Sequence, residues 1–93
     1  GIHPGLLAEA VQRGGIYWFA PEHALAVIRE ARQHGLLLLG IDGAYLTPNS
    51  TQPSLDDSWD YGAQSVPDPY LHAFRFIKDR EAKRLHFEIV LAE

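Results

Sequence analysis

The feature that most constrains the fold is the run Leu36-Leu37-Leu38-Leu39-Gly40-Ile41, which contains no polar side chain. Successive side chains of a strand point to opposite faces, so a strand built from this run is apolar on both faces. That pattern is typical of a central strand whose two sides are both covered. Asp42-Gly43 then either closes a tight hairpin onto Ala44-Tyr45-Leu46, or Gly40 and Gly43 mark bulges in one long bent strand.

Three helices are predicted around this strand. Residues 21 to 34 have apolar residues at helical spacing after Pro21, and Gly35 supplies a stop. A short helix over residues 6 to 13 is ended by Gly14-Gly15. A third helix has Asp68 as its N-cap and Pro69 at its first position, and it ends near Lys83.

Two further segments have the pattern of strands. Residues 16 to 19 form a segment of only four residues with bulky side chains, which indicates an edge strand or an extended segment leading into the next helix. Residues 85 to 91 alternate between apolar and polar side chains, with His86 and Glu88 on a solvent-exposed face. We expect this strand to pair beside residues 36 to 41. A length of ninety-three residues favours a single domain that spans residues 1–93. The predicted class is α+β, with a small mixed sheet of about three strands packed against two to three helices.

A segment with three carboxylates and two aromatic rings, Ser54-Leu55-Asp56-Asp57-Ser58-Trp59-Asp60-Tyr61, carries the functional prediction. It lies within a stretch of 42 residues, Gln33 to Phe74, that has five acids and no Lys or Arg. The other seven acids nearly balance the eight basic residues, so the net charge of -4 comes almost entirely from this stretch. Turn-forming residues from Thr47 to Pro67 predict a loop of about 20 residues, and long loops are more often functional than idle.

An acidic surface with aromatic anchors suits a basic protein partner, because charge steers the encounter and a ring anchors the contact. The predicted partner-binding residues are Asp42, Tyr45, Asp56, Asp57, Trp59, Asp60, Tyr61 and Asp68. This prediction requires the carboxylates to share one side of the molecule and to be free of the chain's own arginines. In the alternative interpretation, Asp56 to Asp60 is a solvated turn and Trp59 folds back to close the core.

Other function classes find little support in the residues. The chain has no Cys, and its five His show no spacing that aims two ligands at one ion, so no metal is expected. No phosphate cradle or nucleophile elbow is present, and no cofactor and no enzymatic activity are expected. An isoelectric point near 5.7 argues against direct binding to nucleic acid. Without a membrane-length apolar run or a signal peptide, we expect a cytoplasmic protein that binds no membrane, with Gly1 as a processed start.

Several short motifs carry a family resemblance. In order over residues 15 to 61 they are Gly15-Ile16, Trp18-Phe19-Ala20, Ala24-Leu25 on a helix, Leu39-Gly40-Ile41-Asp42 with Tyr45, and Asp57-x-Trp59. They resemble small immunity proteins of bacterial polymorphic toxin systems, in particular the immunity protein forty family, although Ile41 stands where that family has a second Gly. The resemblance implies an α+β protein that neutralises a cognate toxin, commonly a nuclease, by direct binding. An acidic loop could then occupy the toxin's basic site as a substrate mimic.

Two competing functions stay open. One is a housekeeping or accessory binding domain whose loop covers its own core. The other is a small hydrolase that uses Asp60 with His72 or His86.

Overall fold

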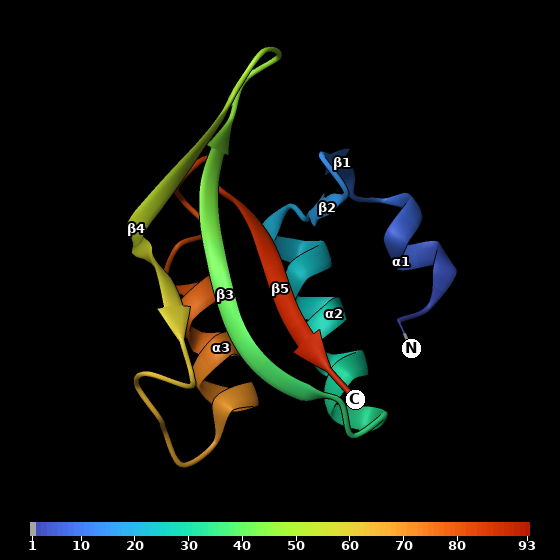
Figure 1. Cartoon of the computed structure of the whole chain (residues 1–93), viewed down its shortest axis with the longest axis vertical. Helices are drawn as coiled ribbons and strands as arrows, with labels where there is room; N and C mark the ends of the chain where they lie inside the picture. The colour runs from blue at the N-terminus through green and yellow to red at the C-terminus, as the bar shows by residue number, and fades with distance from the viewer. Residues whose placement is uncertain (1) are drawn as a thin grey trace.

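The computed structural model describes residues 2–93, which form three helices and five strands (Figure 1). In chain order these are α1 (Pro4–Ala8), β1 (Val11–Arg13), β2 (Ile16–Trp18), α2 (Pro21–Gln33), β3 (Leu37–Leu46), β4 (Thr51–Asp60), α3 (Pro69–Lys78) and β5 (His86–Ala92). The predicted α+β class is confirmed.

The main sheet has three strands in the order β4-β3-β5. The central place of β3 and its pairing with β5 agree with the sequence prediction. Both pairings are antiparallel, however, so the sheet is not mixed. The direction of the β3–β4 pairing follows from its connection, a short turn in which Thr47 N donates to Ser50 O (2.9 Å). A hairpin joined by so short a turn can only be antiparallel.

The β3 strand continues through Asp42 and Gly43 without turning back, so the alternative of one long bent strand is the right one. Its register shifts twice, between Leu38 and Gly40 against β5 and between Ile41 and Gly43 against β4. Such bulges bend a strand and increase its twist.

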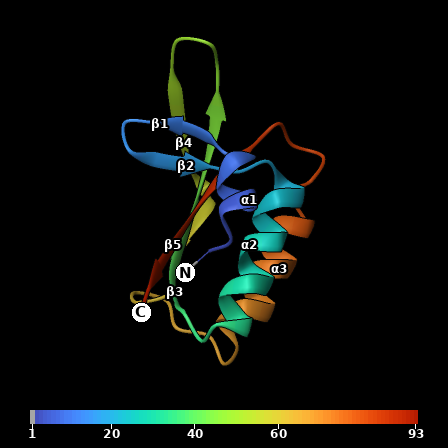
Figure 2. The same ribbon diagram turned by 90° about the vertical axis from the view of Figure 1, so that its right-hand side faces the viewer.

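Helices α2 and α3 pack side by side on one face of this sheet (Figures 1 and 2). The core between the helices and the sheet includes Val27, Ile28, Ile41, Ile77 and Phe87, all of them buried. No helix in residues 2–93 covers the opposite face, and there Leu37 is 56% exposed and Leu39 is 40% exposed. The prediction that β3 is covered on both sides is therefore wrong at these two residues.

The N-terminal segment differs from its prediction. Helix α1 ends at Ala8, and β1 and β2 pair as a hairpin around Gly14 and Gly15, whose φ angles are +56° and +79°. Paired left-handed residues are what a tight hairpin turn requires, and glycine adopts them without strain. The two glycines thus form a hairpin turn and do not end a helix. Arg13 Nη1 donates to Ser50 O (2.6 Å), which ties this hairpin to the tip of the β3–β4 hairpin.

The other helix boundaries follow local chemistry. Helix α2 stops one residue short of the predicted end, ahead of Gly35 at φ +66°. Asp68 caps α3, because its side chain accepts a hydrogen bond from Leu71 N (3.1 Å). Helix α3 ends at Lys78 and not near Lys83, and the turns that follow carry Arg80 and Lys83 to the carboxylate of Asp57 on β4.

Candidate protein-binding surface

The segment predicted as a loop, residues 54–61, belongs mostly to the edge strand β4. Ile41 pairs with Trp59 and Gly43 pairs with Ser54, so the single β3 residue Asp42 lies opposite four β4 residues. Those four residues, Leu55 to Ser58, form a large bulge, which we call the β4 bulge. Bulges use the same small and polar residues as turns, and for that reason the sequence indicated a loop.

Asp57 fastens the β4 bulge to the chain's own cations. Its side chain is buried, and it accepts hydrogen bonds from Arg80 Nε (2.9 Å) and Lys83 Nζ (2.8 Å) at Oδ1 and from Ser54 Oγ (2.7 Å) at Oδ2. Burial acts to raise the pKa of Asp57, but the hydrogen bonds from Lys83, Ser54 and Arg80 outweigh it and hold the pKa below its ordinary value. This geometry contradicts the prediction that Asp57 faces a partner.

Gly43 is the residue that makes room for the bulge. A Cβ atom at this position would overlap the backbone carbonyl oxygen of Asp57, well inside the van der Waals contact distance of two non-bonded atoms. Gly43 N also donates to Ser58 Oγ (3.1 Å), and Ser58 Oγ donates to Ser54 O (2.8 Å). The hydroxyl of Ser58 therefore satisfies the backbone N–H of Gly43 and the backbone carbonyl of Ser54, which a regular ladder would pair.

Arg80 fixes the bulge from the helical side. Its guanidinium lies 3.5 Å from the centroid of the Phe76 ring, and Nη1 donates to Phe76 O (3.1 Å). Nη2 donates to the backbone carbonyl of Asp56 (3.2 Å). Asp56 is held through its main chain only, and its carboxylate stays exposed.

The two predicted aromatic anchors face α3. Tyr61 is buried, its hydroxyl lies 2.8 Å from Nδ1 of His72, and burial raises the pKa of Tyr61. Trp59 is half-buried, with its ring centroid 4.4 Å from that of His72 and its Nε1 donating to Gln64 O (3.0 Å). Trp59 therefore folds back on the core, as the alternative interpretation held.

Two other predicted residues lie outside this segment. Asp68 caps α3, and its carboxylate lies 3.9 Å from Nη2 of Arg32. Tyr45 pairs with Gln52 in the outer part of the β3–β4 hairpin, where it is 37% exposed. The eight predicted residues therefore do not form one docking surface.

One face of the sheet carries no helix (Figure 1). A different group of residues comes together there. Asp42 and Asp60, both exposed, line a hollow of about 260 Å³ together with Leu39, Gly40, Trp59 and Val90. We call the helix-free surface made by Leu37, Leu39, Asp42, Asp60, Glu88 and Val90 the open sheet face.

Glu88 is the functional candidate that the sequence prediction missed. It lies directly opposite Asp42 in the β3–β5 register. Burial raises the pKa of Glu88, and the neighbouring carboxylate of Asp42 raises it further. The alternation of apolar and polar residues in β5 predicted that Glu88 lies on the solvent-exposed face, but only the strand register shows that it lies beside Asp42.

Charge is divided between the two layers. The helical segments 21–34 and 68–84 carry seven of the eight basic residues and five acids, whereas the rest of the chain carries one base and seven acids. Strands β3, β4 and β5 contain no Lys or Arg. Within residues 2–93, no ion pair involves Asp42, Asp56, Asp60 or Glu88. The sheet side of the molecule therefore presents uncompensated negative charge.

The hydrolase pairing is not formed in the described part of the chain. Asp60 Oδ1 accepts from Gly62 N (2.8 Å) and Ala63 N (3.2 Å), and no hydrogen bond joins it to His72 or His86. His72 lies on the helical side of the sheet, while Asp60 lines the hollow on the open face.

Comparison of the sequence with models of known protein families and with curated proteins finds no match. Over residues 2–93, no helix has the length and apolar character needed to cross a membrane. The same residues contain no cluster of three or more His, Asp or Glu side chains that could hold a metal ion.

Proposed function

We propose that the chain is a non-catalytic binding protein whose open sheet face docks on a basic protein. The observation that carries this proposal is the bare side of the central strand. Leu37 and Leu39 belong to a run whose pattern calls for cover on both faces, yet on this side they are 56% and 40% exposed. Apolar side chains of a central strand that residues 2–93 leave this exposed are typical of a surface that a partner covers.

The charges around these leucines indicate what kind of partner fits. Asp42, Asp60 and Glu88 border the apolar centre, and no lysine or arginine of residues 2–93 neutralises them. An apolar centre with a polar rim is the usual anatomy of a protein interface. The acidic rim speeds the encounter with a basic surface and disfavours acidic partners, while the leucines and Val90 supply buried area.

The partner that best combines this chemistry with the sequence resemblance is a cognate bacterial toxin domain. A toxin that cleaves nucleic acid needs positive charge around its active site to hold a phosphate backbone. An acidic face docked there excludes the substrate without any chemistry by the bound protein. Inhibition then requires no cofactor and no catalytic residue of this chain.

The test is binding to the product of the gene that adjoins this one. We expect the wild-type chain to co-purify with that product, and the association rate to fall steeply as salt is raised. The double variant Asp42→Asn/Glu88→Gln should slow association about tenfold at low salt. The matched control is Asp79→Asn, which removes an exposed carboxylate from the helical layer and should leave the rate unchanged.

Replacing the leucines tests the apolar part of the surface. Leu37→Ser/Leu39→Ser should weaken binding by about 2 kcal/mol or more, mainly through faster dissociation. Both side chains are well exposed, so the melting temperature should change little. Unchanged affinity in this variant and in the carboxylate variant would refute the open sheet face as the docking surface.

A further inference from the structure

We propose that the β4 bulge and the groove beside α3 form one self-complementary surface through which two copies of this chain associate. This surface lies at the β4 edge and on the helical side of the sheet, so it is separate from the open sheet face. The proposal is independent of the proposed function.

The projecting part of this surface is Leu55, whose exposed fraction of 89% is the highest of any large apolar residue that the structure describes. Its position is held by the two residues that follow it: Arg80 Nη2 binds the carbonyl of Asp56, and the buried carboxylate of Asp57 binds Arg80 and Lys83. A leucine presented on so rigid a support loses little conformational entropy when it is buried by a partner.

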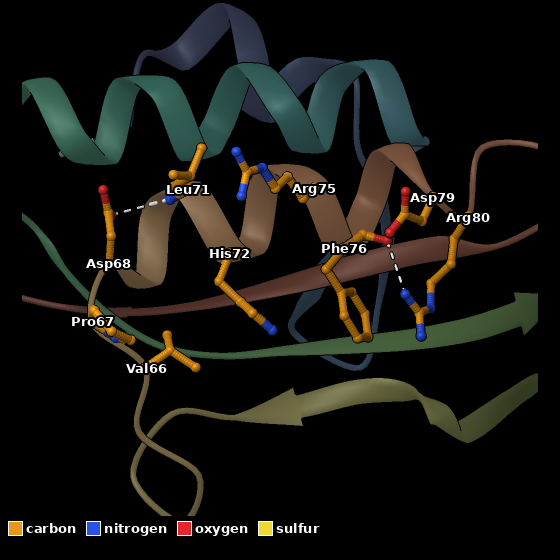
Figure 3. Close-up of a pocket in the computed structure, with 9 residues that line it drawn as sticks. All are labelled: Val66, Pro67, Asp68, Leu71, His72, Arg75, Phe76, Asp79 and Arg80. Atoms are coloured by element: carbon orange, nitrogen blue, oxygen red, sulfur yellow. Dashed lines mark hydrogen bonds between the residues drawn. The ribbon is translucent and has the colours of Figure 1, made fainter.

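The receiving part is a groove of about 440 Å³ along α3 (Figure 3). Val66, Pro67, Leu71 and Phe76 supply its apolar lining. Figure 3 shows His72 and Phe76 extending from α3 toward the β4 edge. An aliphatic side chain of a partner would be surrounded there by apolar atoms.

The projection and the groove lie next to each other, because Arg80 belongs to both. Its side chain lines the groove, and its Nη2 donates a hydrogen bond to the backbone carbonyl of Asp56, the residue after Leu55. When complementary features are neighbours on one surface, a two-fold axis between two copies can place each Leu55 in the groove of the other. Head-to-tail growth into filaments is not needed to satisfy both features.

The charges at this surface match the same arrangement. Asp56 follows Leu55, is exposed, and forms no ion pair in residues 2–93. Arg75 lines the groove, is exposed, and is likewise without an ion pair among the described residues. Inserting Leu55 into the second copy's groove brings Asp56 toward the second copy's Arg75. The occupant that these features favour is therefore a second copy of the chain.

The test measures mass by sedimentation equilibrium over a range of protein concentrations. We expect the wild-type protein to show a concentration-dependent dimer. Leu55→Asp should weaken dimerisation at least tenfold, because it places a charge in an apolar groove. The control Leu37→Asp changes an exposed leucine on the open sheet face and should dimerise like the wild type.

Charge reversal gives a test that does not depend on losing the dimer. Asp56→Arg and Arg75→Asp should each weaken dimerisation, because each creates two like-charge contacts across the two-fold axis. An equimolar mixture of the two variants should dimerise again. In the mixed dimer the introduced arginine meets the introduced aspartate, and the unchanged Asp56 of one copy meets the unchanged Arg75 of the other. A wild-type protein that stays monomeric at millimolar concentration overturns the proposal, as does a mixture that remains monomeric or a dimer that Leu37→Asp abolishes.

Discussion

Replacing Asp57 with Asn should destabilise the folded protein by about 2 kcal/mol at pH 7. The carboxylate accepts two bonds from cations, from Arg80 Nε at 2.9 Å and from Lys83 Nζ at 2.8 Å. The amide of Asp57→Asn can still accept a hydrogen bond, but it lacks the charge that the two cations bind. Because the Arg80 and Lys83 side chains are 23% and 48% exposed, each lost ion pair should cost about 1 kcal/mol. The loss is limited because Arg80 keeps its bonds to Phe76 O and Asp56 O.

The pH dependence makes this prediction specific. The pKa of Asp57 is lower in the folded protein than its ordinary value, so its stabilising effect is complete above that ordinary value. The effect is lost as the pH falls through the lower, folded-state pKa, because protonation removes the charge that Arg80 and Lys83 bind. The difference between wild type and Asp57→Asn should therefore be constant from pH 7 to about pH 5 and shrink below about pH 4.

Urea unfolding at several pH values measures this difference. At pH 7 the variant should also melt about 8 to 16 °C below the wild type. The neighbouring Asp56→Asn is the matched control, because its exposed carboxylate forms no ion pair in residues 2–93, and it should cost less than about 0.5 kcal/mol. A loss of stability at Asp57 that is equally large at pH 3 and pH 7 would show that the ion pairs are not its source.

Three other substitutions test the packing around the site by thermal melting. Gly43→Ala should destabilise by about 2 to 3 kcal/mol, because its Cβ would overlap the Asp57 carbonyl. The control Gly62→Ala places its Cβ 3.2 Å from Asp60 Oδ1, which has to shift only by a few tenths of an ångström, so it should cost less than Gly43→Ala. Asp68→Ala removes the N-cap of α3 and should cost about 1 kcal/mol, with a cost near zero contradicting the cap. Tyr61→Phe removes the hydroxyl bonded to His72 and should also cost about 1 kcal/mol, and an unchanged melting temperature would contradict that bond.

The elements that the sequence predicted well are those whose boundaries depend on local chemistry. Asp68 followed by Pro69 starts α3, and Gly35 follows the end of α2, because capping and left-handed glycine act within one turn. The β4 strand could not be predicted in the same way. Its bulge depends on Gly43 across the sheet and on Arg80, which lies 23 residues beyond Asp57 in the chain.

The same distinction explains the site. Asp42 and Asp60 were predicted as binding residues from composition alone, and the structure brings both to one hollow. Glu88 joins Asp42 only through the register of β3 and β5, which no local pattern specifies. Conversely, Asp57 has the same composition signal as its neighbours, but its side chain points toward the helical layer, where Arg80 and Lys83 bind it.

The two proposed surfaces predict a stoichiometry together. A dimer formed at the β4 edge and the α3 groove leaves both open sheet faces uncovered, since these lie on the other side of the sheet from α3. The dimer should therefore bind two partner molecules, and the monomeric Leu55→Asp variant should bind one with the same affinity per site. Light scattering of the complexes gives both masses. If Leu55→Asp loses partner binding while remaining folded, the two surfaces overlap, and the partner contacts the β4 bulge itself.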